Sequence, residues 1–149
     1  MRKIASLLLA FALVLGFMPI SAQATENRNI IILEDGSYIE IHVDESNARI
    51  TNEKSGTKTY SCYDSSDTLQ WQAKLSATFT YNGTIASCTS ASCSVTIYES
   101  KWYEISNATT RSGNMATTAL TMGKKFLGIT VSRPEYTITL TCDKDGNLS

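Results

Sequence analysis

Leu69-Gln-Trp-Gln-Ala-Lys-Leu-Ser-Ala-Thr-Phe-Thr-Tyr81 alternates without interruption between apolar and polar side chains. A period of two is that of a β-strand with one buried and one solvent-facing side. We therefore expect a strand over 69–81, with Gln70 and the other polar residues on the outside. The residues expected to face the core are Leu69, Trp71, Ala73, Leu75, Ala77, Phe79 and Tyr81.

A hairpin is expected directly after this strand. Asn82-Gly83 is a dipeptide that tolerates the positive φ angles of a two-residue type I′ turn. Such a turn fixes the register of the returning strand over 84–88, so that Ala86 lies opposite Phe79 and Cys88 lies opposite Ala77. A polar loop over 89–92 is then expected to lead into a third strand, whose alternating apolar residues are Cys93, Val95 and Ile97.

Similar short runs, each bounded by turn residues, recur along the chain. They predict strands over 30–33, 38–43, 59–63, 116–122, 127–131 and 136–142, with a turn at Glu34-Asp-Gly-Ser37. The segment 44–58 has no period and reads as a loop or linker, and around 99–107 the pattern lapses into a bend or short helical turn. Seven to nine short strands without an amphipathic helix predict an all-β fold, a single antiparallel sandwich or barrel-like domain.

Composition agrees with strands and limits the class of protein. Ser and Thr supply 35 of the last 125 residues, which suits exposed positions of a pleated sheet better than helices. Hydrophobic residues make up 42% and charged residues 18% of the 149-residue chain, values that exclude collagen-like, coiled-coil and fully disordered proteins.

The N-terminus has the pattern of a secretory signal. Met1-Arg-Lys3 is positively charged, residues 4–18 are nearly all apolar, and Ala22-Gln-Ala24 matches the small-x-small cleavage pattern. Cleavage is expected between Ala24 and Thr25, which gives a signal over 1–24, a hairpin and polar linker over 25–58, and a core domain over 59–149. The apolar run is shorter than a bilayer span. We expect a secreted, extracellular product with no stable membrane anchor.

The charge of the secreted part argues against two kinds of partner. Residues 25–149 carry 11 basic against 14 acidic side chains, dispersed rather than gathered in a stripe that could follow a phosphate backbone. We therefore expect no nucleic-acid partner. An anionic membrane surface would require a basic amphipathic helix, and none is visible. The oligomeric state does not follow from the sequence.

Four cysteines in an exported chain predict disulfides. The pairing Cys88–Cys142 with Cys62–Cys93 is favoured, because each bridge closes a long loop and restricts the unfolded chain by roughly 4 kcal/mol in the chain-entropy model. The alternative is a Cys88–Cys93 disulfide across the expected hairpin, which would stabilise the fold less. Neither zinc nor thiol chemistry is expected, since the spacings give no CxxC pair and no cation adjoins a thiol.

No catalytic, cofactor or metal site is predicted. His42 is the single histidine, and the alternation places it on an exposed strand face with Tyr38 and Glu40. The nearby carboxylates lie in turns, and Asp143-Lys-Asp-Gly-Asn147 lacks the length and closing Glu of an EF-hand, so it reads as a frayed tail.

Aromatic residues are the best candidates for ligand contact. Trp102, Tyr103 and Tyr98 lie where the strand pattern lapses, as a platform for sugar rings or a protein partner would at a sheet edge. Simple packing is the competing interpretation of these residues.

A family resemblance rests on four segments: Ala77-Thr-Phe-Thr-Tyr-Asn-Gly-Thr84, Ser87-Cys-Thr-Ser-Ala-Ser92, Val95-Thr-Ile-Tyr98 and the terminal Thr139-Leu-Thr-Cys-Asp-Lys-Asp-Gly-Asn-Leu-Ser149. In these segments the chain resembles a family of small secreted proteins of unknown function from Gram-positive, Clostridia-like bacteria. The resemblance implies an exported β-rich domain and no particular site residue. The expected function is non-enzymatic recognition of an extracellular glycan or protein. The alternative is a secreted antibacterial or membrane-active effector of the bacteriocin type.

Overall fold

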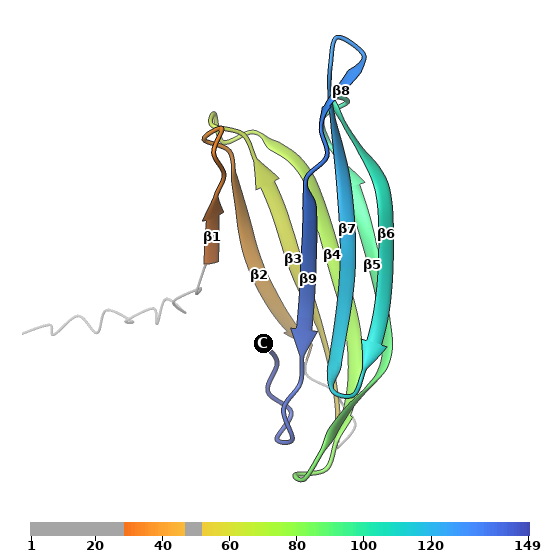
Figure 1. The fold of residues 1–149 in the computed structure, drawn as a ribbon. Helices are drawn as coiled ribbons and strands as arrows, with labels where there is room; N and C mark the ends of the chain where they lie inside the picture. Colours follow the sequence, from red (N-terminus) through yellow and green to blue (C-terminus); the bar gives the residue numbers. More distant parts are fainter. Residues whose placement is uncertain (1–28, 47–51) are drawn as a thin grey trace, which may run out of the picture.

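The computed structural model describes residues 29–46 and 52–149, and within these ranges every regular element is a β-strand (Figure 1). The expected signal over 1–24, with its cleavage point at Ala24 and Thr25, lies outside the described residues. The nine strands are β1 (Asn29–Ile32), β2 (Tyr38–Ser46), β3 (Glu53–Tyr63), β4 (Leu69–Tyr81), β5 (Ala86–Ile97), β6 (Trp102–Ser112), β7 (Met115–Phe126), β8 (Ile129–Ser132) and β9 (Glu135–Thr141). The predicted all-β class is confirmed.

The strands form two antiparallel sheets. The first sheet has the order β1-β2-β3-β4-β5, and in the second β7 pairs with β6, β8 and β9. In Figure 1 the second sheet lies in front of the first. Both contribute to one apolar cluster, whose fully buried members include Ile39, Cys62, Trp71, Leu75, Phe79, Leu120, Met122, Ile138 and Leu140. The sheets therefore share a single core.

β4 is the strand that the alternating stretch predicts, with one local exception. Trp71, Ala73, Leu75, Ala77 and Phe79 are buried as expected. At the start of the strand, however, a bulge shifts the pairing with β3 and buries Gln70 while Leu69 is half-buried. The Gln70 amide donates to Asp64 at 3.0 Å and to the Thr68 carbonyl at 2.8 Å, so it points inward and not, as predicted, to solvent.

The hairpin after β4 has a different register from the predicted one. The Asn82 carboxamide oxygen accepts from the N–H groups of Thr84 and Ile85, and the Asn82 N–H donates to the Ile85 carbonyl. This makes a loop over 82–85 instead of a two-residue turn. Cys88 consequently lies opposite Phe79, not Ala77, and Ala86 lies opposite Tyr81.

The predicted loop over 89–92 is wrong, because β5 is one continuous strand. Phe79 pairs with Cys88 and Thr78 pairs with Ser90, so Thr89 is the extra residue of a β-bulge. Before the bulge the core-facing residues have even numbers, as Cys88 does, and after it they have odd numbers, as Ala91 and Cys93 do. In the sequence this change looks like a loop between two separate strands.

The sequence does not predict β6 either, and the reason is again a β-bulge. Its pairing with β7 skips Ile105, so the inward positions switch from even to odd numbers after Trp102. The expected bend or helical turn near 99–107 is therefore replaced by a strand that is regular from Ser106 onward. A tight Gly113-Asn114 turn, with φ of 55° at Gly113, returns the chain to β7.

The predicted linker over 44–58 is mostly strand. β2 runs to Ser46, β3 begins at Glu53, and the two pair along the full length of β2. Ile39 and Ile41 of the N-terminal hairpin are buried in the common core. The hairpin is thus an integral part of the first sheet and not a loosely attached element.

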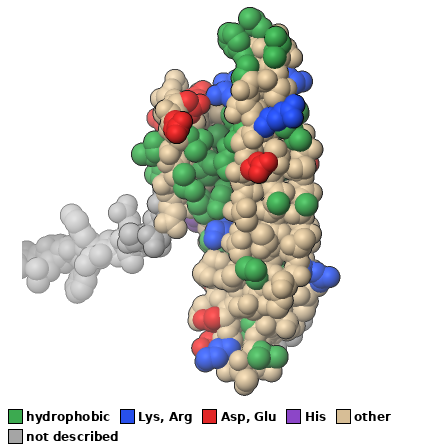
Figure 2. Space-filling model, viewed as in Figure 1, with side chains coloured by type: hydrophobic (Ala, Val, Ile, Leu, Met, Phe, Trp, Pro, Cys, Tyr) green, Lys and Arg blue, Asp and Glu red, His purple; other side chains and the backbone are tan. Residues whose placement is uncertain are grey.

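Two further segments differ from the sequence prediction. β7 continues through the expected connection to Phe126, and Leu127-Gly128 alone makes the turn into β8. This β7–β8 hairpin ends in a cap of exposed apolar side chains (Figure 2). The tail after β9 is not frayed, because it folds back and pairs with itself. Thr141 and Ser149 exchange two backbone hydrogen bonds, and Cys142 and Leu148 pair as an isolated antiparallel β-bridge.

Candidate functional site

The aromatic residues singled out from the sequence do not share one surface. Trp102 is 8% exposed and packs edge-on against Trp71, with 6.1 Å between the ring centroids. Tyr103 points to the other face of β6, where its hydroxyl lies 2.7 Å from that of Thr130 and its ring lies under the Lys125 ammonium. Tyr98 is 53% exposed in the turn before β6. The structure thus separates the three residues instead of assembling them.

Trp102 does border one groove. Together with Tyr136, Asp35 and Lys124 it lines a space of about 580 Å³ between the β1–β2 turn and the second sheet. The Asp35 carboxylate and the Lys124 ammonium are 3.1 Å apart across this groove. The indole Nε1 of Trp102 is buried without a hydrogen-bond partner. Because Trp102 is almost fully buried and the Lys124 ammonium lies 5.5 Å from its ring centroid, the indole lacks the open ring face that stacking on a sugar requires.

The four cysteines are free thiols in the structure, and their placement contradicts the predicted two-bridge framework. Cys62 lies opposite Trp71, whereas Cys93 lies opposite Leu75 on the second strand over. This places their Cα atoms ~16 Å apart. A disulfide needs a separation below about 7 Å. Cys88 and Cys93 occupy the same extended strand, about 16 Å apart, so the alternative hairpin bridge fails too.

Cys62 is also distant from the other two cysteines. Cys88 lies opposite Phe79, eight residues along β4 from the Trp71 level. Cys142 follows β9, six residues beyond Tyr136, whose ring centroid lies 5.1 Å from that of Trp71. Because every two-bridge pattern needs a partner for Cys62, none fits this fold. Cys88 and Cys142, by contrast, both lie next to the β6–β7 turn. The Cys88 N–H donates to the carbonyl of Gly113 in that turn, and the Cys142 N–H donates to the carbonyl of Asn114.

A long hollow runs over the outer face of the first sheet, and we call it the outer trough. Three adjoining spaces make it up, with volumes of about 470, 300 and 270 Å³ from the β1–β2 turn toward the far end of β2. Glu40 and Tyr63 line both the first and the second space, and Asp44 lines both the second and the third. The three spaces therefore adjoin one another along β2 and β3.

The middle of β3 forms the floor of the outer trough. Thr59 and Ser61 point away from the core, yet they are only 8% and 6% exposed. Longer side chains on the neighbouring strands rise beside them, among them His42 on β2 and Gln72 and Lys74 on β4. The Gln72 amide donates to the Ser61 hydroxyl at 2.9 Å, which holds one wall against the floor.

Aromatic rings close one end of the outer trough. Tyr38 and Tyr63 stand on adjacent strands, directly opposite each other, with ring centroids 5.0 Å apart and planes inclined by 16°. The Tyr38 hydroxyl donates to the Asp67 carboxylate at 3.0 Å, and this contact, with burial as the larger cause, raises the pKa of Tyr38. Ile30 and Ile32 of β1 add apolar surface beside the rings.

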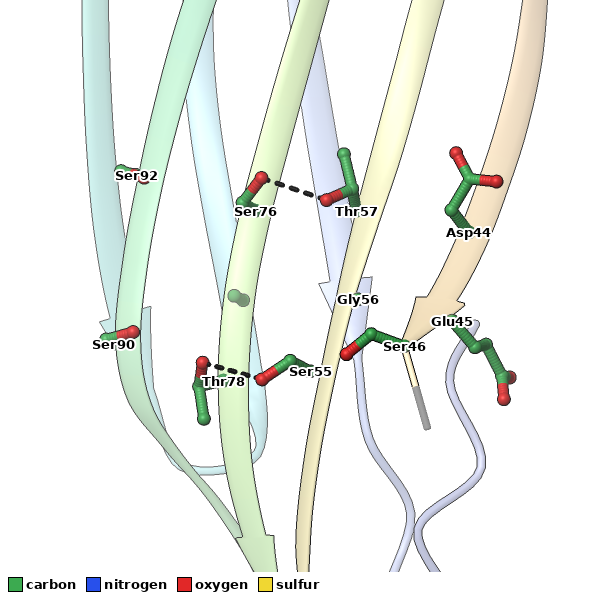
Figure 3. Close-up of a pocket in the computed structure, with 11 residues that line it drawn as sticks. Asp44, Glu45, Ser46, Ser55, Gly56, Thr57, Ser76, Thr78, Ser90 and Ser92 are labelled. Atoms are coloured by element: carbon green, nitrogen blue, oxygen red, sulfur yellow. Dashed lines mark hydrogen bonds between the residues drawn. The ribbon is translucent and has the colours of Figure 1, made fainter. Parts of the chain in front are cut away.

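Hydroxyl groups cover the opposite end, where the trough crosses four strands (Figure 3). Two cross-strand pairs join β3 to β4 by hydrogen bonds of 2.9 Å, Ser55 to Thr78 and Thr57 to Ser76. Ser90 and Ser92 continue the array on β5. Among the described residues that line this end, the charged side chains lie on the β2 side, where the Asp44 carboxylate lies 2.8 Å from Nε2 of His42 and borders the hydroxyl array.

The alternation predicts an exposed strand face for His42 and Gln72, and the abundance of Ser and Thr predicts exposed sheet surface. The sequence predicts loops, not strands, for four hydroxyl residues of the trough, namely Ser55, Thr57, Ser90 and Ser92, and it does not predict that any of these residues form a site. They share one face because of the strand order β2-β3-β4-β5, which a single sequence does not specify. The partly exposed imidazole of His42 agrees with its predicted outward position.

Among residues 29–46 and 52–149, no cluster of three or more His, Cys, Asp or Glu side chains is placed to hold a metal ion. In the same part of the chain, no helix has the length and apolarity required to cross a bilayer. No known protein family, curated protein or solved structure shows significant similarity to this chain.

Proposed function

We propose that the protein is a secreted, non-enzymatic β-sandwich module that binds an extended extracellular glycan in the outer trough. The observation that carries this proposal is the row of three adjoining spaces, from the Tyr38–Tyr63 pair to the hydroxyl array. A sugar chain presents apolar C–H faces and a high density of hydroxyls. Its recognition therefore requires aromatic rings together with many short-range donors and acceptors.

The polar lining suits a neutral or weakly charged glycan. Ser and Thr hydroxyls both donate and accept, as sugar hydroxyls do, and Gln72 adds an amide with both capacities. Lys74 and Glu40 offer charges of both signs in the middle space, and the His42 imidazole adds a further polar group. A protein ligand would favour a larger apolar patch at the centre, whereas the centre of this trough is formed by Thr59 and Ser61.

Of the predicted disulfides we retain only Cys88–Cys142. Both side chains belong to the core-facing set, and both residues hydrogen-bond to the β6–β7 turn, on either side of it. A bridge there would join the first sheet to the second at the end remote from Trp71. Cys62 and Cys93 remain thiols in this proposal.

Binding to polysaccharides and a glycan array tests the proposal. The variant His42→Ala/Gln72→Ala/Lys74→Ala removes exposed or half-buried side chains from the middle space and leaves the core unchanged. We expect it to weaken binding by at least about tenfold, as losing two or three hydrogen bonds of ~0.5–1.5 kcal/mol each would do.

The matched control is Glu104→Ala/Ser106→Ala/Thr110→Ala, three exposed positions on β6 of the other sheet. It should bind as the unsubstituted protein does. Equal binding by the trough variant and the control, or no binding of the unsubstituted protein to any glycan, would refute a glycan site in the trough.

A further inference from the structure

The β7–β8 hairpin ends in an apolar tip, which we define as Phe126, Leu127, Ile129 and Val131. These side chains are 67%, 86%, 71% and 58% exposed, respectively, and they lie within a stretch of six residues, 126–131. In Figures 1 and 2 the hairpin rises beyond the ends of the other strands, and its end is a cap of hydrophobic side chains. Scattered surface apolar residues are ordinary, but a contiguous projecting group marks a contact surface.

The turn at the tip favours a polar sequence, which this chain does not have. Leu127 and Gly128 have φ angles of 50° and 81°, the combination of a type I′ turn between the paired residues Phe126 and Ile129. Asn or Gly normally fills the first of these positions, because larger side chains are strained at positive φ. A leucine there bears backbone strain and exposes its side chain as well, so folding alone does not explain it.

Basic residues flank the apolar tip. The ten residues from Lys124 to Arg133 include three cations and no acidic side chain. Lys125 and Arg133 are exposed, and the Lys125 N–H donates to the carbonyl of Lys101, which brings a further cation to this end of the molecule. Lys124 is neutralised by Asp35, and Glu135 follows Arg133 by two residues. Lys101 lies outside the hairpin and near the Asp64 carboxylate, so Lys125 and Arg133 carry most of the positive charge beside the tip.

We propose that the tip inserts into the headgroup region of an anionic lipid bilayer, with Lys125, Arg133 and Lys101 contacting lipid phosphates. Apolar side chains at a protruding end with cations just behind them match the layering of such an interface, apolar below and negatively charged above. The sequence argued against a membrane partner because it lacks a basic amphipathic helix, but a strand hairpin presents the same two chemistries. Insertion of one tip is peripheral binding and does not span the bilayer.

Flotation with vesicles tests this inference on the protein lacking residues 1–24. Binding is expected to phosphatidylcholine vesicles that contain phosphatidylglycerol, to be weaker on phosphatidylcholine alone, and to fall as salt is raised to ~0.5 M. The variant Phe126→Ser/Leu127→Asn should bind at least about tenfold more weakly, given the apolar area removed. Asn suits the type I′ position, so this variant should fold at least as stably as the unsubstituted protein.

The control variant Ile85→Ser/Ile105→Ser also removes two exposed apolar side chains, one from the loop after β4 and one from the β6 bulge. It should retain full vesicle binding. A Leu127→Trp variant should show a blue shift of its added fluorescence on anionic vesicles, and Ile85→Trp should not. Absence of vesicle binding, equal binding by the tip and control variants, or a tip-dependent dimer in sedimentation without vesicle binding would each overturn the proposal.

Discussion

Asp35 lies in the turn between β1 and β2, and its side chain links this turn of the first sheet to the second sheet. Its carboxylate accepts from the hydroxyl and the N–H of Ser37 and pairs with Lys124 of β7 at 3.1 Å. The Ser37 hydroxyl bond, then the Lys124 bond, lower its pKa from 3.8 to about 2. A carboxyl with a depressed pKa stabilises the fold above its ordinary pKa, and this contribution is lost as the pH falls from 3.8 through about 2.

Asp35→Asn should therefore lower the free energy of unfolding at pH 7, by no more than about 1 kcal/mol because the side chain is 54% exposed and screened by solvent. Urea unfolding at several pH values should show this difference shrinking below about pH 4 and vanishing near pH 2. Glu34→Gln in the same turn is the control and should have little effect. A difference that persists unchanged at pH 2 would contradict the role of the ionised carboxylate.

β5 depends on a single extra residue. Thr89 is the bulge that lets Cys88 on one side and Cys93 on the other both face the core, and its carbonyl accepts from Arg111 of β6. Deleting Thr89 should turn one half of the strand inside out, because a shift of one residue exchanges the two faces. We expect a loss of about 2–4 kcal/mol in urea unfolding. Thr89→Ser, which keeps the residue count, should be nearly neutral; a deletion variant as stable as Thr89→Ser would show that the bulge is dispensable.

Bulges also explain why the sequence did not predict the continuity of β5 or the strand β6. The stretch 71–81 alternates without interruption because no extra residue interrupts β4 there, and its core positions were predicted correctly. At Thr89, Ile105 and Gln70 an extra residue inverts the parity of the residues beyond it. A search for a constant period reads that inversion as a loop or a lapse. Strand existence was therefore predictable up to each bulge, whereas continuity across it depends on the partner strand.

At the scale of the whole molecule, candidate sites depend on which strands become neighbours. The outer trough gathers Tyr38 with Tyr63, and His42 with Lys74, residues that are 25 and 32 positions apart in the chain. Only the order β2-β3-β4 brings them to one face. The apolar tip, by contrast, lies within residues 126–131, so its hydrophobic and neighbouring basic residues are evident in the sequence. The sequence does not show that the hairpin projects beyond the other strands.

The shared core makes Cys62 a reporter of whether the two sheets separate. The residue is fully buried beside Trp71, and burial raises its pKa to about 11, so roughly a thousandth of it is thiolate at pH 8. In the reduced native protein, alkylation of Cys62 at pH 8 should be at least about a hundredfold slower than that of the half-buried Cys88, and the two rates should converge in urea. Mass spectrometry of peptides measures both. Without reductant, Cys62 and Cys93 should still be alkylated after unfolding, whereas Cys88 and Cys142 should be protected together by their bridge. Rapid labelling of native Cys62, or a bridge that includes it, would mean that the two sheets do not stay closed over Trp71.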